Sequence, residues 1–321
     1  MLLPFPKNSL WGFVNECGEW CLSPQYDDVT AFYEGTATVV KNGLCGTINA
    51  RGVVIVPLLY SELEDFYDGL AVGFRKDMAV WQILKTTGDV LPLSRCKWAW
   101  NLGRGMIYGC GVFCDDFVIL REDGSRLNDI VYQEVLSLFD DNFIHCKRDG
   151  GFRIEDKRGR IVNRFDADGM LYFYGGKAVA WRGEKKGIID ANGNILMQFE
   201  YEWIEMIGYG SERFVLARKK YDEGLRLYEI NTGKAAGRSV EDARHCSFRG
   251  EDYYWILRNG MWTVLNGSLK PLACNIGTDV RFLADEDGER AGRQSDLVLV
   301  KCKNNWRYHL IDGSIFIDDV R

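Results

Sequence analysis

A short turn built around a glycine recurs along the chain at nearly constant spacing. The turn glycines are Gly18, Gly52, Gly88, Gly124, Gly159, Gly193, Gly233, Gly267 and Gly313. Successive members lie 34, 36, 36, 35, 34, 40, 34 and 46 residues apart. A period of this length is typical of a repeat protein, in which each supersecondary unit packs only on its neighbours. The two long intervals predict insertions near residues 217–224 and 284–294.

The repeating unit is predicted to be β. Segments such as WGFVN (11–15) and KGIID (186–190) are short, rich in β-branched and aromatic residues, and run directly into turns. Dipeptides such as Asn192-Gly193 tolerate the positive φ of a tight hairpin turn. A tyrosine follows the turn glycine by eight residues in four copies: Tyr26, Tyr60, Tyr132 and Tyr201. The nearest helix candidate, residues 129–139, has ambiguous periodicity, so we predict an all-β protein.

A second pattern, aromatic-aromatic-acid-Gly, has the same period. It occurs as Phe32-Tyr33-Glu34-Gly35 and again as Phe66-Tyr67-Asp68-Gly69. Together with Trp11-Gly12-Phe13-Val14-Asn15, Gly18 and Tyr26-Asp27, it resembles the bacterial WG-repeat family. The resemblance covers residues 9–73 and 150–205 best. It implies a bacterial β-repeat protein that acts as an interaction module, and it carries over no catalytic residue.

The expected architecture follows from the length of the unit. A unit of 34–36 residues is long enough for three or four short strands with tight turns. We favour a β-propeller-like ring of short four-stranded meanders; an open β-solenoid or superhelix of hairpins is the alternative. Residues 1–321 are interpreted as a single repeat domain. Its approximate repeats are 9–42, 43–77, 78–115, 116–150, 151–185, 186–224, 225–259 and 260–305, with a partial repeat at 306–321.

Composition narrows the class of protein. The chain is 46% hydrophobic and 27% charged, which is enough apolar material for a folded core. Its net charge of -6 argues against nucleic acid and anionic membranes as partners. No signal peptide or membrane span is recognisable. The ten irregularly spaced cysteines are best interpreted as reduced thiols in a cytoplasmic protein.

No motif in the sequence names a reaction. The dipeptides His145-Cys146 and His245-Cys246 combine residue types that hold zinc or form a nucleophile. Adjacent residues on a strand point to opposite faces, however, so neither dipeptide easily supplies one site. The spaced cysteines Cys17 and Cys21, and Cys110 and Cys114, are interpreted as structural. We therefore predict no catalytic residue, no metal site and no cofactor.

Three groups of residues are candidates for binding. Trp98 and Trp100 depart from the repeat phase and, as alternating strand residues, share a face that could form an aromatic platform. Tyr253 and Tyr254, followed by Trp255, form a second aromatic cluster. The third group lies in the longest predicted insertion: Asp285, Glu286, Asp287 and Arg290. Plain burial of the aromatic residues and a solvated charged loop are the alternatives.

These observations lead to three hypotheses about function. The first is a non-enzymatic scaffold for protein–protein interaction, with an unidentified protein partner. A narrower version is a bacterial immunity or effector-associated protein whose acidic surface suits a basic partner. The second is a module that binds carbohydrate or another small ligand. The third, more remote, is a hydrolase that uses carboxylates.

Overall fold

The computed structural model of the chain describes residues 2–93, 96–111, 117–139, 143–173, 175–208, 213–283, 296–303, 305–318 and 320. These residues form strands and turns, and none of them lies in a helix. The chain divides into two compact units. Unit 1 comprises Met1–Asn142, Lys157–Gly159 and Asp319–Arg321, and unit 2 comprises Phe143–Asp156 and Arg160–Asp318. No described helix is long and apolar enough to cross a membrane.

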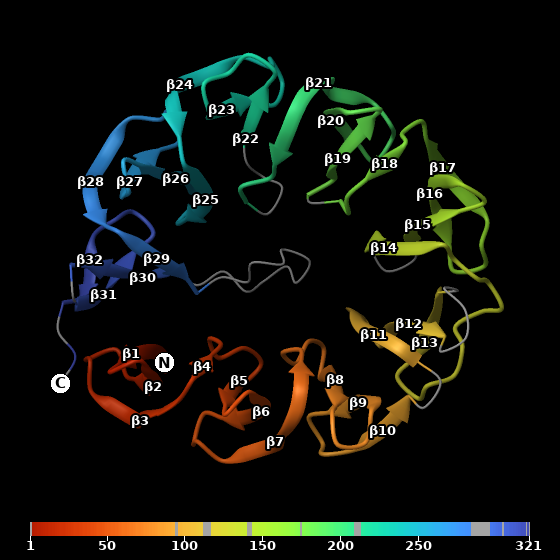
Figure 1. Ribbon diagram of the computed structural model, residues 1–321, viewed down its shortest axis with the longest axis horizontal. Helices are drawn as coiled ribbons and strands as arrows, with labels where there is room; N and C mark the ends of the chain where they lie inside the picture. Colours follow the sequence, from red (N-terminus) through yellow and green to blue (C-terminus); the bar gives the residue numbers. More distant parts are fainter. Residues whose placement is uncertain are drawn as a thin grey trace. The chain divides into compact units, whose positions relative to one another are not determined.

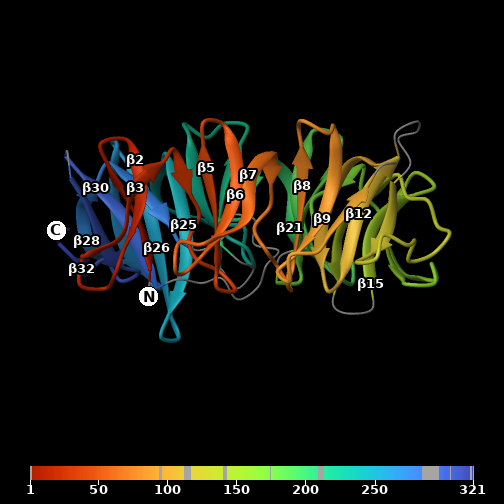
Figure 2. The ribbon, with the colours of Figure 1, turned by 90° about the horizontal axis from the view of Figure 1, so that it is seen from below.

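Unit 1 is a series of antiparallel meanders. Its strands are β1 (Leu3–Lys7), β2 (Leu10–Val14), β3 (Trp20–Tyr26), β4 (Asp28–Val29), β5 (Thr36–Lys41), β6 (Leu44–Asn49), β7 (Val54–Leu63), β8 (Leu70–Arg75), β9 (Val80–Lys85), β10 (Val90–Leu93), β11 (Cys96–Gly103), β12 (Met106–Gly111), β13 (Phe117–Arg121) and β14 (Glu134–Phe139). They form the sheets β1-β2-β3, β4 to β10 in chain order, and β11-β12-β13. Strands adjacent in sequence are therefore adjacent in each sheet, as Figures 1 and 2 show for β5, β6 and β7.

Unit 2 repeats this construction. Its strands are β15 (Phe143–Arg148), β16 (Gly151–Asp156), β17 (Ile161–Phe165), β18 (Gly169–Met170), β19 (Lys177–Arg182), β20 (Lys185–Asp190), β21 (Ile195–Glu205), β22 (Phe214–Lys219), β23 (Leu225–Glu229), β24 (Ala235–Val240), β25 (Asp242–Phe248), β26 (Glu251–Arg258), β27 (Met261–Asn266), β28 (Pro271–Gly277), β29 (Asp279–Phe282), β30 (Leu297–Cys302), β31 (Asn305–Leu310) and β32 (Ile315–Ile317). They form antiparallel sheets β15-β16-β17, β18 to β24, β25 to β28 and β29 to β32. Each meander is a blade of β-propeller type, and the all-β prediction is confirmed.

The recurring tyrosine marks the crossing from one blade to the next. Tyr60 lies opposite Cys45 of β6 on one side and opposite Arg75 of β8 on the other. Strand β7 is thus the outer strand of one blade in its first half and the inner strand of the next blade in its second half. Tyr201 does the same in β21, between Lys186 and Lys219. Both tyrosine side chains are buried.

In three repeats the glycine of the Trp-Gly pattern lies opposite a bulge in the neighbouring strand. The pairing of β6 with β7 jumps from Cys45 and Tyr60 to Thr47 and Val56, so residues 57–59 of β7 lie opposite Gly46 alone. A Cβ atom on Gly46 would stand 2.7 Å from the carbonyl oxygen of Val56. Gly12 and Gly187 face the same close backbone approach. A glycine inside a strand commonly marks such a contact.

Where the bulge is absent, the glycine is absent too. Gln82 and Arg153 occupy the equivalent position in two other repeats. Gln82 pairs directly with Pro92, and Arg153 pairs directly with Arg164, with no inserted residues opposite either of them. The side chain of Gln82 is buried and accepts a hydrogen bond of 2.7 Å from the hydroxyl of Tyr60. The ladder is therefore regular at these two positions. Bulges of three residues also lie opposite Arg226 and Thr263, so a bulge does not by itself require glycine.

The acid-Gly turns connect successive repeats. Glu34 and Gly35 have φ angles of 47° and 77°, and they turn the chain into β5. The carboxylate of Glu34 accepts hydrogen bonds from the backbone N–H groups of Asp68 (3.0 Å) and Gly69 (3.1 Å), in the equivalent turn of the next repeat. Asp68 in turn accepts one from the N–H of Arg104 (2.8 Å), one repeat further on. The acid is repeated because each turn binds the backbone of the following turn.

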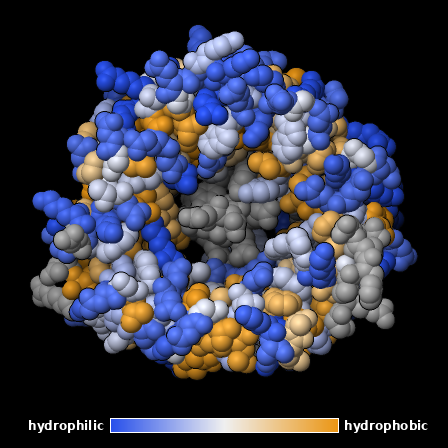
Figure 3. Space-filling view, in the orientation of Figure 1, coloured by the Kyte–Doolittle hydropathy of each residue, from blue (hydrophilic) through white to orange (hydrophobic). Residues whose placement is uncertain are grey.

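The hydrophobic core lies between the faces of successive sheets. In unit 1, Val72 and Ile83 of one blade pack with Ala99, Ile107 and Val118 of the next. In unit 2, Trp255, Trp262 and Val264 pack with Val298 and Val300. Both faces of most blades pack against neighbouring blades. The central strands therefore consist of nearly continuous runs of apolar residues. Apolar side chains also reach the surface in places, as the orange areas of Figure 3 show.

Two further sequence expectations can be compared with the fold. Residues 129–139 contain no helix, and their second half is strand β14. The insertion expected near 217–224 falls on the β22–β23 hairpin, whose connection spans residues 220–224. The equivalent β5–β6 hairpin needs only residues 42–43. The other expected insertion, 284–294, lies outside the described residues.

Replacing Gly46 with alanine tests the role of the bulge. The added methyl group meets backbone atoms of Val56 and Leu58, which cannot rotate away. We expect Gly46→Ala to lower the free energy of unfolding by about 1–3 kcal/mol, the usual cost of forcing atoms into a packed interior. The measurement is urea unfolding followed by tryptophan fluorescence. Gly151→Ala is the matched control, because its methyl group would meet no atom closer than 4.0 Å; equal losses in both variants would contradict the explanation.

Candidate functional site

Four aromatic side chains form a continuous row across β11, β12 and β13, which we call the aromatic strip. The strip consists of Trp98, Trp100, Tyr108 and Phe117. The ring centroids of Trp98 and Trp100 are 5.9 Å apart, those of Trp100 and Tyr108 are 5.6 Å apart, and those of Tyr108 and Phe117 are 4.8 Å apart. The strand register explains the row, because Trp100 lies directly opposite Tyr108. The prediction that Trp98 and Trp100 share one face is confirmed.

The two tryptophans of the strip are exposed because they lie on the face of β11 that does not pack on the preceding blade, whereas Tyr108 is buried. Trp98 is 47% exposed and Trp100 is 39% exposed. Between and beyond them, Ala99 and Asn101 point to the opposite, buried face. The amide nitrogen of Asn101 donates hydrogen bonds to the carbonyl oxygens of Tyr67 (3.1 Å) and Leu70 (2.9 Å). These hydrogen bonds anchor the buried face of β11, so the strand that carries the exposed rings is held in position.

The rings of the strip do not form a flat surface. Trp98 and Trp100 contact each other edge to face at 71°, and the ammonium group of Lys97 lies 5.6 Å from the centre of the Trp98 ring. Trp100 and Tyr108 are stacked at 25°, and Tyr108 and Phe117 at 21°. Both faces of Tyr108 are therefore covered by neighbouring rings.

The indole N–H groups of Trp98 and Trp100 have no hydrogen-bond partner within the described part of the chain. Trp81, by comparison, donates its N–H to the carbonyl oxygen of Lys97 at 2.7 Å, and Trp255 donates to that of Ile311 at 2.9 Å. Trp20 also has an unpartnered N–H, but that group is buried. An exposed indole N–H without a partner in the protein is available as a donor to a ligand.

Opposite charges lie beside two rings of the strip. Lys97 forms no ion pair with any described residue and stands beside Trp98. The hydroxyl of Tyr108, the third ring of the row, accepts a hydrogen bond from the N–H of Val135 at 3.5 Å. Burial raises the pKa of this hydroxyl, and the nearby carboxylate of Glu134 raises it further. A cation therefore lies beside Trp98 and an anion lies near Tyr108.

The second aromatic cluster is not brought together. Tyr253 and Tyr254 are adjacent on β26 and point to opposite faces. Tyr254 is fully buried, packs edge-on against Phe214 at 5.4 Å, and its hydroxyl accepts a hydrogen bond from the N–H of Arg213. Tyr253 is partly buried beside Phe248. Burial thus accounts for Tyr254. The remaining candidates, Asp285, Glu286, Asp287 and Arg290, lie outside the described residues.

The histidine-cysteine dipeptides are buried in their sheets. The ring of His145 lies between Phe165 and Phe173, with Nε2 at 3.4 Å from the sulfur of Met170. Burial lowers the pKa of His145 to about 3 and raises that of the Cys146 thiol to about 12. A neutral imidazole and a protonated thiol on opposite faces do not form a nucleophilic pair. Within the described residues no three His, Cys, Asp or Glu side chains gather as metal ligands.

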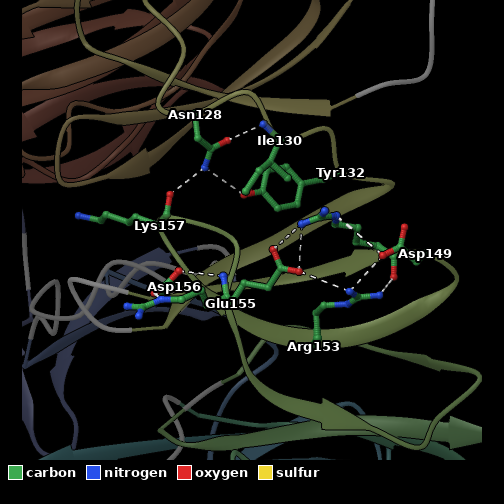
Figure 4. A network of polar contacts seen from close by, with 10 residues as sticks. Asn128, Ile130, Tyr132, Asp149, Arg153, Glu155, Asp156 and Lys157 are labelled. Atoms are coloured by element: carbon green, nitrogen blue, oxygen red, sulfur yellow. Dashed lines mark hydrogen bonds and ion pairs between the residues drawn. The ribbon is translucent and has the colours of Figure 1, made fainter.

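Sequence reasoning missed a buried charge network in unit 2. Glu155 is fully buried on β16, between the guanidinium groups of Arg148 (3.2 Å) and Arg153 (3.5 Å) (Figure 4). Arg153 also reaches the exposed carboxylate of Asp149 at 3.3 Å. The charges balance and the carboxylate is paired, so the network is expected to fix the β15–β16 hairpin rather than bind a ligand. The sequence feature that could have indicated this network is Arg153, which stands where other repeats have glycine.

Comparison with known proteins connects this fold to a repeat family. The family model of the WG containing repeat matches residues 11–45, 46–72 and 187–220. These segments contain the glycines that lie under the bulges and the tyrosines at the crossings, and the match confirms the WG-type repeats there. A comparison with curated proteins finds no match.

Several solved structures are similar to the chain. A eukaryotic initiation factor is 8% identical, with 89% of this chain and 95% of that chain covered and a TM-score of 0.52. Hsv2 of Kluyvelomyces marxianus is 9% identical over 86% and 93% of the two chains, with a TM-score of 0.43. The β-propeller domain of the Trilobed protease from Pyrococcus furiosus is 14% identical over 81% and 98%, with a TM-score of 0.41. Likeness at these identities concerns the fold alone.

The neutral state of His145 predicts a specific dependence of stability on pH. Its pKa is about 3 in the folded chain and lies near the ordinary 6.5 when unfolded, so the unfolded state binds the proton first. Stability from this group is complete above pH 6.5 and is lost as the pH falls, by up to ~1.4 kcal/mol per pH unit. We expect His145→Leu to remove this part of the slope. Urea unfolding of both proteins between pH 7 and pH 4 measures it; parallel curves would refute the assignment.

Proposed function

We propose that the protein is a non-enzymatic scaffold for protein–protein interaction and that the aromatic strip is a contact surface for its partner. The observation that carries the proposal is the pair of exposed tryptophans, Trp98 and Trp100, whose N–H groups have no partner among the described residues. Tryptophan is among the residues that most often dominate binding energy at protein interfaces. Here the two rings stand on a strand that its buried neighbours hold in place, which lowers the entropy lost on binding.

The ring geometry favours a protein over a carbohydrate as the partner. A sugar ring stacks on an open, flat aromatic face. In the strip, Tyr108 is covered on both sides and one face of Trp98 lies under the ammonium group of Lys97. Trp98 and Trp100 meet at 71° and so offer no common plane. Two exposed indoles that meet edge to face suit the apolar side chains and carbonyl groups of a polypeptide.

The chemistry of the described residues supports a binding role rather than catalysis. The two candidate nucleophile and base groups, Cys146 and His145, are held protonated and neutral respectively by burial. Glu155, a fully buried carboxylate, is occupied by two arginines. The repeat family that matches the chain contributes a structural pattern of glycines and tyrosines, and the positions it matches here serve the fold.

A narrower form of the proposal concerns the setting. We infer a bacterial, cytoplasmic protein associated with an effector or acting as an immunity protein. The net charge of -6 supports a basic protein partner and disfavours nucleic acid and anionic membranes. Recognition would then combine the strip with the overall negative charge of the chain.

Removing the strip tryptophans should abolish capture of the partner. The tagged chain is incubated with lysate of its native host, and bound proteins are identified by mass spectrometry. We expect one stoichiometric protein with the unaltered chain and at least tenfold less of it with Trp98→Ala or Trp100→Ala, since loss of a central interface aromatic costs about 2 kcal/mol or more. Tyr221→Ala is the control, because Tyr221 is 89% exposed but lies on the β22–β23 hairpin of unit 2.

Thermal unfolding of each variant separates binding from folding. All three substitutions replace exposed aromatic residues, so their melting temperatures should stay close to that of the unaltered chain. Undiminished capture by both tryptophan variants would rule out the strip as the contact surface.

A further inference from the structure

We propose that Asn42 is a site of spontaneous deamidation, at which the folded chain converts its own asparagine into aspartate and isoaspartate. In an Asn-Gly dipeptide the glycine nitrogen reaches the preceding carboxamide most easily, because glycine has no side chain to hinder it. The sequence contains four such dipeptides: Asn42-Gly43, Asn192-Gly193, Asn259-Gly260 and Asn266-Gly267. Only the first has both reacting groups without a hydrogen-bond partner among the described residues. The site lies outside the aromatic strip and has no part in the proposed function.

The reaction needs two groups of one turn and water. The backbone nitrogen of Gly43 forms a bond to Cγ of Asn42, and the bond from Cγ to Nδ2 breaks. Nδ2 leaves as ammonia and takes up the proton that the glycine nitrogen gives up. Water then opens the five-membered succinimide ring at one of its two carbonyl carbons, which gives aspartate or isoaspartate.

Asn42 and Gly43 form the two-residue turn between β5 and β6. Their φ angles are 53° and 71°, the left-handed conformation typical of a type I′ hairpin turn. Both residues are exposed, so water reaches them. The N–H of Asn42 donates to the carboxylate of Asp27 at 2.6 Å, which holds the turn at its first residue. The N–H of Gly43 and the carboxamide of Asn42 have no hydrogen-bond partner among the residues that the structure describes.

The turn at Asn259 has the same shape but a different neighbour. It joins β26 to β27, with φ angles of 51° at Asn259 and 68° at Gly260. Here the nitrogen of Gly260 donates to the carboxylate of Glu241 at 3.2 Å. This hydrogen bond has to break before the nitrogen attacks, and the negative charge of the carboxylate opposes loss of the proton. The same turn is therefore protected in one repeat and open in another.

The other two dipeptides are protected in different ways. The N–H of Gly193 donates to the carbonyl oxygen of Asp190 at 2.9 Å, so the attacking nitrogen is again occupied. The carboxamide oxygen of Asn266 accepts hydrogen bonds from the N–H groups of Ser268 (3.1 Å) and Lys270 (2.9 Å). Ring closure requires this carboxamide to turn its face toward the next backbone nitrogen, and the two hydrogen bonds oppose that rotation.

Conversion of Asn42 changes the turn in two ways. Each product carries a carboxylate in place of a neutral amide, so the net charge of -6 becomes one unit more negative. The new charge lies in the turn that the carboxylate of Asp27 already binds, and like charges at short range repel. Isoaspartate also lengthens the main chain by one CH2 group, which disturbs the pairing of Lys41 with Leu44 across the turn. The β5–β6 hairpin is therefore less stable after conversion.

The test follows all four sites in one sample. The full chain is incubated at mildly alkaline pH, either folded or unfolded in guanidinium chloride, and mass spectrometry of its peptides measures the deamidated fraction of each site over time. In the folded chain we expect the rate at Asn42 to exceed that at Asn259 by about tenfold or more, the equivalent of one hydrogen bond to a charged group. In the unfolded chain the four rates should be comparable, because the protecting hydrogen bonds are gone.

The variant Glu241→Ala removes the protecting carboxylate. The rate at Asn259 should rise about tenfold, toward that at Asn42, while the rate at Asn42 stays unchanged. Glu241 is exposed, so the variant is expected to fold, and tryptophan fluorescence checks this. Glu241→Gln, which removes only the charge, provides the same comparison if the alanine variant unfolds. Equal rates at Asn42 and Asn259 in the folded chain, a faster rate at Asn192 or Asn266, or no response of Asn259 to loss of the carboxylate overturns the inference.

Discussion

Three repeats of this protein, those with Gly12, Gly46 and Gly187, share one close contact between backbones. The outer strand of a blade bulges by several residues and lies against the Cα atom of a glycine in the neighbouring strand, with no room for a side chain between them. The bulge bends the strand and lets its second half leave one blade and enter the next. A buried tyrosine occupies the crossing, opposite the first residue of the Trp-Gly pair. The constant spacing of this glycine and tyrosine in the sequence results from this geometry.

Much of the fold could be read from the sequence because the features that build it are local. Turn glycines, β-branched strands and the eight-residue step to the tyrosine were sufficient to predict an all-β repeat of propeller type. The division of the chain into two compact units was not visible, since it depends on how faces pack rather than on any local pattern. The sequence shows that Arg153 stands where another repeat has Gly46, but it does not show why. Only the paired strands reveal that no bulge stands opposite that arginine.

The candidate site could also be predicted from the sequence only in part. Trp98 and Trp100 drew attention because they depart from the repeat pattern, and alternation correctly placed them on one face. The alternation of residues along a strand does not show which face is buried. Tyr253 and Tyr254 were therefore both predicted as binding candidates, although Tyr254 is buried. Tyr108 and Phe117, which complete the strip, looked like ordinary strand residues. Their contribution arises from cross-strand register, which pairs residues distant from the tryptophans in sequence.

Because strands β7 and β21 are shared between blades, the boundaries of the sequence repeats do not coincide with the boundaries of the blades. A repeat counted from turn to turn ends in the middle of a continuous strand, and each half of that strand belongs to a different blade. Two blades joined in this way cannot open independently, since breaking one exposes the ladder of the other. A chain lengthened by copying whole repeats would therefore gain half of one blade and half of the next.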